Sequence, residues 1–495
     1  MIRYWKQILF FIVLTAYFLY GLAPDMNWES IGADQMNYVV AAQHNAPAGL
    51  SGNPLYILLG SLLVRLPTNP FWSLGLLSAL PAVGTCVVIF LTVSKFTKNA
   101  WAPYIASLVF ASSFSVWAES VIAETYLLTA FVSSLVIYFC LTRKYYWMSA
   151  MMALGVGLHP LGIWVALPCL VFTWWRENRD YKLVGKVIGI TLLGFIFRLR
   201  DLFTSPATTN LFFLQNPYEN LLYSAGGYFS NSVVPIQPTI QRLGEDFIAL
   251  GSSLWAIVLA VFTFKKSPGV ILLWSIFGLA FFFPFASIYP QWIKYMFLPI
   301  LPLSILVGLG IDKLQWRTLS AVCLVPCLVF MTLNVTTYSP GKTIDVTPTT
   351  ARQFYYTLNN VPDNAVVVGH TWGHPDLVVL YYLVESGDRF SYVNYDSRDN
   401  LEYVEYQTNK GIVMPSLISE PDSVFDIPSL DYLIYGRPFT VQEFAQELQS
   451  LNPDRKVLVT YVESSEIPME FGLISSSEYN PGLNDLPSGK VQFSG

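Results

Sequence analysis

The sequence predicts a polytopic α-helical membrane protein of about eleven transmembrane helices with a soluble α/β domain at its C-terminus. Of its 495 residues, 53% are hydrophobic and 12% are charged, whereas soluble globular proteins average about 25% charged residues. Residues 1–335 carry a net charge of +7 (19 basic, 12 acidic), and residues 336–495 carry −12 (9 basic, 21 acidic). An apolar first part and an acidic, polar second part indicate one region in a membrane and one in water.

The predicted spans follow one another through the first 335 residues. The first run, 8–23, comes after Arg3 and Lys6 and is followed by no small-residue cleavage pattern. We therefore expect an uncleaved first helix whose N-terminus is cytoplasmic. The other apolar runs are 72–94, 101–117, 121–141, 148–158, 160–175, 183–199, 247–264, 269–288, 295–310 and 318–335.

The distribution of basic residues supports this arrangement. With a cytoplasmic N-terminus, fourteen Lys and Arg residues fall in cytoplasmic connections and five fall on the opposite side of the membrane region, as the positive-inside rule expects. Residues 148–175 are interpreted as two helices broken at 157–160, because one continuous helix would move Arg176, Arg179 and Lys182 outside. We expect a multi-pass protein of the inner or plasma membrane.

Two polar loops and the C-terminal domain are expected on the outer side. The first loop, 24–71, contains an apolar stretch at 54–66 that is too short to span a bilayer and should lie in its interface. The second loop covers 200–246. In the domain, 336–495, alternation of strands (365–369, 430–435, 456–462) with helices (376–385, 441–451) predicts a small extracytoplasmic α/β fold.

Composition argues against several classes of protein. All five cysteines lie in apolar runs, so a disulfide scaffold is excluded for the C-terminal part, and no CxxC spacing suggests a metal. The acidic C-terminal part lacks the basic face that nucleic acid binding requires. No glycine-rich phosphate-binding loop points to ATP as a driving substrate.

Ionisable residues gather at the outer surface of the predicted membrane region. Because a charged side chain is costly near hydrocarbon, residues of this kind at the ends of spans indicate a function. Nine of the twelve acidic residues of 1–335 fall on this side. Together they predict a reaction site, although a helix cap would explain Asp34, a helix-start acid Glu124, and a capped helix break His159. The candidate residues on this side are the acids Asp34, Glu119 and Glu124, the cations Arg198, Arg200 and Lys294, and His159 at the broken helix.

Three stretches of the first 175 residues form a recognisable set: the loop from Asp34 through 53–60 (Asn-Pro-Leu-Tyr-Ile-Leu-Leu-Gly), the segment 115–126, and 155–159, which ends in His159. Together they resemble the GT-C superfamily of membrane glycosyltransferases. Within the superfamily the chain is most similar to the bacterial domain-of-unknown-function 2723 family, whose eukaryotic relatives are protein O-mannosyltransferases. One departure is that Gln35 follows Asp34, where the family usually places a second acid close by.

The resemblance implies transfer of a sugar, mannose or another hexose, from a polyprenyl-phosphate carrier to an extracytoplasmic acceptor, either a protein Ser/Thr or a glycan. Because an acceptor hydroxyl is a weak nucleophile, a carboxylate should take its proton during an inverting displacement, and we assign this role to Asp34. Arg198, Arg200 and Lys294 are expected to bind the lipid phosphate, and Glu119, Glu124, His159 and Tyr126 the acceptor or the sugar. No cofactor besides the lipid-linked donor is expected, and the missing second acid leaves a divalent metal unsupported.

Two other functions stay open at this point. A transporter or lipid-carrier flippase would place ionisable residues near the bilayer midplane and often shows repeat symmetry; mid-span charges are nearly absent from the sequence, and no repeat is visible. The third possibility is a non-catalytic scaffold whose C-terminal domain recruits partners. The sugar, the carrier length, the acceptor class and the oligomeric state are not specified by these patterns.

Overall fold

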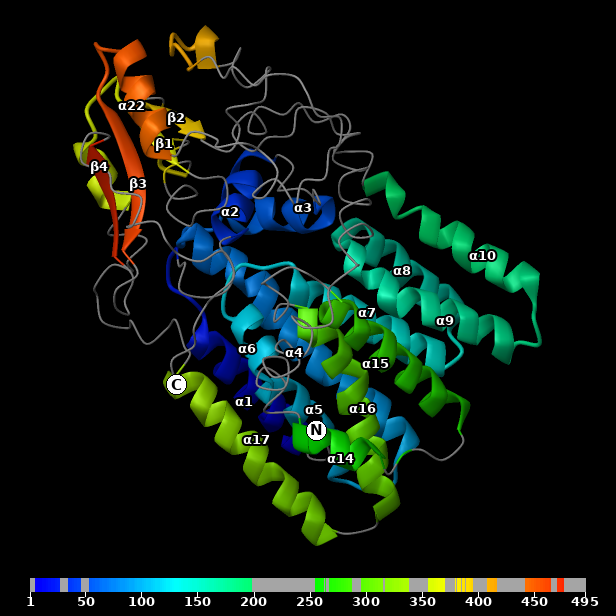
Figure 1. Cartoon of the computed structure of the whole chain (residues 1–495). Helices are drawn as coiled ribbons and strands as arrows, with labels where there is room; N and C mark the ends of the chain where they lie inside the picture. Colours follow the sequence, from blue (N-terminus) through cyan, green and yellow to red (C-terminus); the bar gives the residue numbers. More distant parts are fainter. Residues whose placement is uncertain are drawn as a thin grey trace. The chain divides into compact units, whose positions relative to one another are not determined.

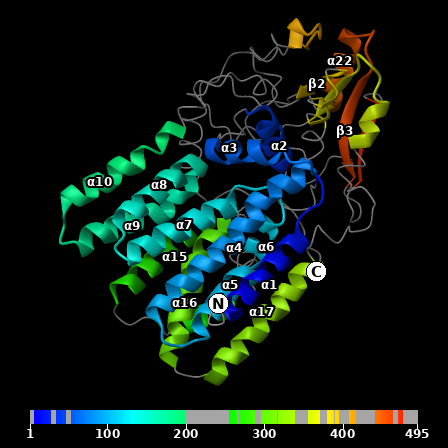
Figure 2. The ribbon, with the colours of Figure 1, turned by 180° about the vertical axis from the view of Figure 1, so that it is seen from behind.

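The chain divides into two compact units. The computed structural model describes residues 5–26, 34–45, 53–197, 254–261, 263, 267–286, 295–314, 317–337, 355–369, 379, 381–383, 385–387, 389–394, 407–415, 441–463 and 470–475. Contacts between Cα atoms define a helical unit, Met1–Thr209 with Leu214–Thr347, and a C-terminal unit, Asn210–Phe213 with Pro348–Gly495. Figures 1 and 2 show them from opposite sides.

The helical unit consists of helices that coincide with the apolar runs of the sequence, since every predicted run overlaps at least one helix. The first half contains α1 (Trp5–Gly21), α2 (Asp34–His44), α3 (Pro54–Leu63), α4 (Pro70–Phe96), α5 (Ala102–Ser112), α6 (Phe114–Ser120), α7 (Tyr126–Leu141), α8 (Tyr145–Leu158), α9 (Ile163–Arg176) and α10 (Tyr181–Leu192). The second half contains α14 (Leu254–Val261), α15 (Pro268–Ala286), α16 (Phe297–Leu314) and α17 (Arg317–Thr337).

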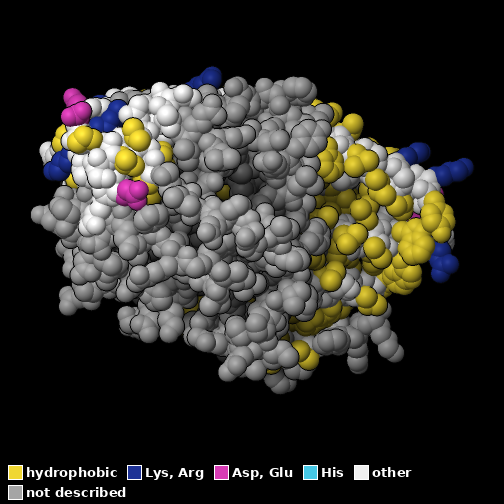
Figure 3. All heavy atoms as spheres, turned by 45° about the horizontal axis from the view of Figure 1, so that its top comes forward, with side chains coloured by type: hydrophobic (Ala, Val, Ile, Leu, Met, Phe, Trp, Pro, Cys, Tyr) yellow, Lys and Arg dark blue, Asp and Glu magenta, His cyan; other side chains and the backbone are white. Residues whose placement is uncertain are grey.

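The surface of the helical unit is apolar over a wide area, which Figure 3 shows as a broad hydrophobic surface bordered by Lys and Arg. On α9, Ile163, Leu167, Val171 and Trp175 recur at four-residue spacing and are each more than half exposed. A soluble protein rarely exposes such a patch, whereas lipid is a suitable solvent for it. Among the described residues, α4 alone is long and apolar enough to cross a membrane by itself, so the count of about eleven spans stays a prediction.

Two boundaries differ from the sequence prediction, and one ambiguous break is confirmed. The run 101–117 is divided at Ser113, whose extended backbone separates α5 from α6, and the helix expected from residue 121 begins at Tyr126. The Ser113 hydroxyl donates to the Val109 carbonyl at 2.9 Å, a local side-chain bond that competes with helix continuation. The predicted break at 157–160 is present, because His159 is extended between α8 and a 3-10 turn at Pro160–Gly162.

Several buried polar side chains in the interior of the bundle bond to protein partners. The Asn334 amide on α17 donates to the Tyr17 hydroxyl on α1 at 3.2 Å and to the Ser112 carbonyl at 3.0 Å, which joins three helices. On α5, the Ser107 hydroxyl donates to the Cys86 carbonyl of α4 at 2.8 Å. All five cysteines are free and buried, as the sequence predicted. These contacts hold the helices in register without relying on hydrophobic burial, which is weak between helices in lipid.

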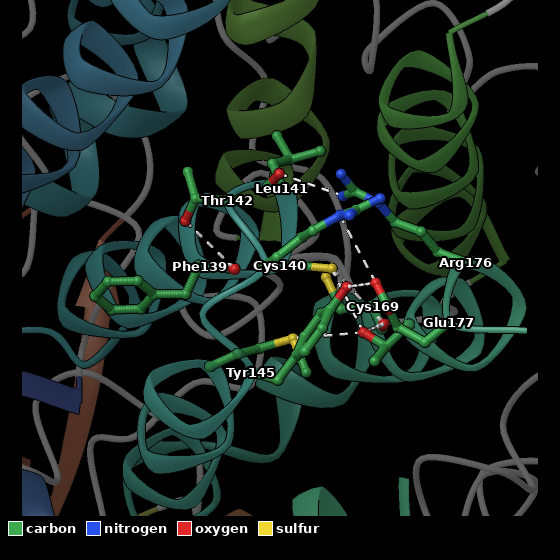
Figure 4. A network of polar contacts seen from close by, with 11 residues as sticks. Phe139, Cys140, Leu141, Thr142, Tyr145, Cys169, Arg176 and Glu177 are labelled. Carbon is green, nitrogen blue, oxygen red and sulfur yellow. Dashed lines mark hydrogen bonds and ion pairs between the residues drawn. The ribbon is translucent and has the colours of Figure 1, made fainter. Parts of the chain in front are cut away.

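A polar cluster joins α7, α8 and α9 at the end predicted to be cytoplasmic, and we call it the Glu177 cluster (Figure 4). The Tyr145 hydroxyl donates to Glu177 Oε1 at 2.5 Å, and Arg143 Nε lies 3.7 Å from the same oxygen. Arg176 Nη1 donates to the Leu141 carbonyl at 3.3 Å. Since Leu141 ends α7, this arginine satisfies a carbonyl that the helix itself cannot.

The C-terminal unit is built on a four-stranded sheet in the order β2-β1-β3-β4. Strand β1 (Val366–Gly369) pairs in parallel with β2 (Ser391–Asn394) and β3 (Val457–Glu463), and β4 (Glu470–Ser475) is antiparallel to β3. The expected strands at 365–369 and 456–462 and the helix α22 (Val441–Leu451) are confirmed. The expected strand at 430–435 lies outside the described residues. The two edge strands of the sheet, β2 and β4, were not predicted.

Candidate active site

Helices α2 and α3 lie across the end of α4 that the sequence places outside the cytoplasm (Figures 1 and 2). Helix α2 begins at Asp34, as predicted, and α3 covers the apolar stretch expected in the interface. Pro54 starts α3 with a φ that suits the first helical turn, and Gly60 allows α3 to approach Leu74, which would lie 2.6 Å from an added Cβ. The side chain of Asp34 and all of Arg198, Arg200 and Lys294 lie outside the described residues, so their roles stay predictions.

A short loop between α6 and α7 positions the two candidate glutamates. Glu119 lies at the end of α6 and Glu124 in the loop, and both side chains are fully buried. The Ser78 hydroxyl of α4 accepts from the Glu124 N–H at 3.0 Å and donates to the Glu124 carbonyl at 2.9 Å. The Ala23 N–H donates to the Val121 carbonyl at 2.7 Å. These hydrogen bonds hold the loop against α4 and against the residues that follow α1, and so they fix the position of the Glu124 backbone.

Tyr126 and His159, separated by 33 positions in the sequence, are in direct contact. Their ring centroids are 5.5 Å apart, and both side chains are buried. The Leu161 N–H donates to His159 Nδ1 at 3.2 Å, so the neutral imidazole carries its proton on Nε2. Tyr126 also packs against Tyr295 and Phe297 at the start of α16, each with ring centroids 5.8 Å away.

The structure thus brings three of the four predicted sugar-binding or acceptor-binding residues into one region: Glu124, Tyr126 and His159. The fourth residue, Glu119, lies at the end of α6, before the loop that carries Glu124. Carboxylates and an imidazole N–H in a buried site are suited to bind hydroxyl groups.

Trp117, also on α6, is a packing residue. The centroid of its ring lies 4.4 Å from that of Tyr17, and the ring stacks on Phe18. Gly21 makes this possible, since a Cβ at that position would lie 2.2 Å from the Trp117 ring.

Sequence inspection overlooked Tyr56 in α3. Its side chain is among the largest that are fully buried. The centroids of the Tyr56 and Tyr38 rings are 5.1 Å apart, and the Asn53 amide donates to the Tyr38 hydroxyl at 3.3 Å. Burial, followed by the negative charge of Glu124, raises the pKa of Tyr56 well above its usual value. In the sequence, a tyrosine within an apolar stretch looks like an interfacial anchor, so only the fold reveals its proximity to Glu124.

No group of three or more His, Cys, Asp or Glu side chains that could hold a metal ion occurs in the part of the chain that the structure describes.

The chain is similar in fold to a solved structure. The chain is similar to ArnT from Cupriavidus metallidurans bound to undecaprenyl phosphate, with a TM-score of 0.51 and 15% identity over 77% of this chain and 75% of that one. The apo state of the same enzyme gives a TM-score of 0.46 and 15% identity over 80% and 90% of the two chains. The likeness to the undecaprenyl phosphate-bound structure shows the fold, which is that of a polytopic membrane protein.

A family model matches part of the helical unit. Residues 37–183, from α2 to the start of α10, match the protein O-mannosyl-transferase TMEM260 N-terminal domain. This match confirms, for residues 37–183, the resemblance to O-mannosyltransferase-like proteins that the sequence indicated. No curated protein matches it significantly.

Proposed function

We propose that the protein transfers a hexose, with mannose the first candidate, from a polyprenyl-phosphate carrier to an acceptor outside the cytoplasm. The observation that carries the proposal is the match of residues 37–183 to a protein O-mannosyl-transferase domain, which covers Glu119, Glu124, Tyr126 and His159. The fold is supporting evidence, because the similar ArnT structure holds undecaprenyl phosphate. The acceptor is a protein Ser/Thr hydroxyl or a glycan hydroxyl.

The reaction is a single displacement at the anomeric carbon. The acceptor oxygen forms a bond to this carbon, the bond from the carbon to the phosphate oxygen breaks, and the anomeric configuration inverts. Asp34 takes the acceptor proton as the bond forms, and polyprenyl phosphate leaves with both bonding electrons. Arg198, Arg200 and Lys294 stabilise the charge that develops on the phosphate.

The described residues supply the sugar or acceptor contacts. Glu119 and Glu124 accept hydrogen bonds from hydroxyl groups, and the Nε2–H of His159 donates one. Tyr126 offers an aromatic face beside the histidine. The orientation, with a cytoplasmic N-terminus and an external C-terminal unit, is part of the proposal and agrees with the distribution of Lys and Arg.

The test is release of bare carrier by purified protein from undecaprenyl-phosphate mannose, glucose or galactose in the presence of Ser/Thr peptides or glycan acceptors. We expect one of these donors to be consumed, and we expect Asp34→Asn to slow the release by about 10²- to 10⁴-fold, the usual contribution of a general base.

The matched control is Asp180→Asn, at the end predicted to be cytoplasmic. Asp180 caps α10 by accepting from the N–H groups of Lys182 and Leu183, and asparagine caps helices equally well, so this variant should keep full activity. An Asp34→Asn protein that inserts normally and transfers at the wild-type rate would contradict the mechanism. Solute uptake by proteoliposomes without any sugar donor would favour a transporter instead.

A further inference from the structure

Tyr56 belongs to a group of buried polar atoms that lack protein partners. Its hydroxyl, the Thr125 hydroxyl, the Asn53 side-chain oxygen and the Gln35 amide nitrogen are all buried and accept or donate no hydrogen bond among the described residues. Leaving such an atom unsatisfied costs about 1–3 kcal/mol. Natural proteins retain an atom of this kind where water or a ligand completes it.

These atoms come from two helices, α2 and α3, from the residue that precedes α3, and from the loop that precedes α7. Gln35 and Tyr38 are one helical turn apart on α2, Tyr38 contacts both Asn53 and Tyr56, and the charge of Glu124 acts on the Tyr56 hydroxyl. Thr125 follows Glu124 directly. Ser78 fastens the backbone of Glu124 to α4, so the site is held in place before any ligand arrives.

Several hydroxyl groups in the predicted spans, unlike those of Tyr56 and Thr125, donate to backbone carbonyls of their own helix. Thr85, Thr92 and Ser304 each donate to the carbonyl four residues earlier at 2.7–2.9 Å. Thr125 and Tyr56 do not follow this pattern. A hydroxyl that could have been satisfied locally, or replaced by an apolar group, is instead left available at the outer end of the bundle.

We propose that the Tyr56 and Thr125 hydroxyls, with Glu124, bind hydroxyl groups of the sugar of the lipid-linked donor. The inference rests on the proposed function and names the part of the substrate that this subsite takes. A hexopyranose presents several hydroxyls, each of which both donates and accepts, and it therefore matches a mixed set of buried donors and acceptors.

Burial decides between the donor sugar and the acceptor. Tyr56, Glu124 and Thr125 expose no side-chain surface, so the surface of a folded protein acceptor cannot reach them, and of the two substrates only the sugar unit is small enough to be bound by buried groups. Enclosure also keeps water from the activated sugar. A tyrosine hydroxyl is protonated at neutral pH, so Tyr56 donates a hydrogen bond to the sugar while the side chain of Glu124 accepts one.

The experiment compares Tyr56→Phe with Tyr17→Phe in the full-length protein. Tyr17 is the matched control because its hydroxyl accepts from the Asn334 amide and so has a protein partner. Unfolding midpoints are measured without ligand, with undecaprenyl phosphate, and with undecaprenyl-phosphate mannose, glucose and galactose. The KM for the consumed donor is measured in parallel.

We expect Tyr56→Phe to raise the donor KM about 3- to 10-fold, the effect of one neutral hydrogen bond, and to lose the extra stabilisation that the sugar adds over the bare carrier. Its ligand-free midpoint should equal or exceed that of the wild type. Tyr17→Phe should show the reverse: a lower midpoint and an unchanged KM.

A Tyr56→Phe protein with a lowered midpoint and an unchanged donor KM would overturn the subsite while leaving the transferase in place. If no glycosylated carrier stabilises the wild type more than the bare carrier does, and none is consumed, the proposed function fails and the subsite with it.

Discussion

The helical unit contains two tyrosine–glutamate pairs at its opposite ends, and they are built differently. In the Glu177 cluster, the Tyr145 hydroxyl donates to Glu177 at 2.5 Å, and Arg143 lies near the same oxygen. In the other pair, the Tyr56 hydroxyl is under the influence of the Glu124 charge but has no hydrogen-bond partner among the described residues.

The presence or absence of a hydrogen bond therefore distinguishes the two pairs. Tyr145 and Glu177 hold helices together, whereas Tyr56 and Glu124 are suited to bind a ligand. A satisfied pair contributes to stability, and removing a partner from it weakens the fold. A buried hydroxyl without a protein partner contributes nothing of this kind, and its removal should leave the fold intact. Functional sites are where such local costs are retained.

In the comparison of the two tyrosine–glutamate pairs, the largest effect is expected at Glu124. Glu124→Gln should lower sugar transfer about 10- to 100-fold, because a hydrogen bond to a charged group contributes about 1.5–3 kcal/mol. Glu177→Gln should keep transfer within about 2-fold of the wild type, since glutamine still accepts from Tyr145. Carrier-release rates of both purified variants check this. Equal loss in the two variants would erase the distinction between the clusters.

A second prediction concerns the satisfied interior. Asn334→Ala should lower the free energy of unfolding by about 1–2 kcal/mol, because the variant leaves the Ser112 carbonyl and the Tyr17 hydroxyl without their shared donor. Thermal unfolding in detergent measures the change, and carrier release per folded molecule should stay at the wild-type level. Unchanged stability would mean that these three helices are held by packing alone.

The smallest effect is expected at Arg143. Its side chain is 60% exposed, so its ion pair with Glu177 contributes at most about 1 kcal/mol, and its φ of 60° is a left-handed conformation that favours glycine. Arg143→Gly should therefore be more stable than Arg143→Ala by about 1 kcal/mol. Unfolding midpoints of the two variants provide the measurement, and a more stable alanine variant would contradict the strain.

The sites of the helices could be predicted from sequence because their cause is local. Long apolar runs, basic connections and the break before Pro160 depend on neighbouring residues, and each run overlaps a helix in the structure. The loop at 121–125 was mistaken for helix, since its residues are compatible with both states and the Ser78 contact that holds it lies 46 positions away.

The candidate site was only partly predictable, for the same reason. The sequence alone determined the two-regime organisation, the apolar runs and the identity of Glu124, Tyr126 and His159 as residues in unusual positions. Tertiary structure decided that Tyr126 contacts His159, that Ser78 holds the Glu124 loop, and that Tyr56 is buried with a hydroxyl that has no hydrogen-bond partner among the described residues. Hydropathy is a sum over neighbours along the chain, whereas a binding site is a set of contacts between helices, and those contacts exist only after the helices have packed.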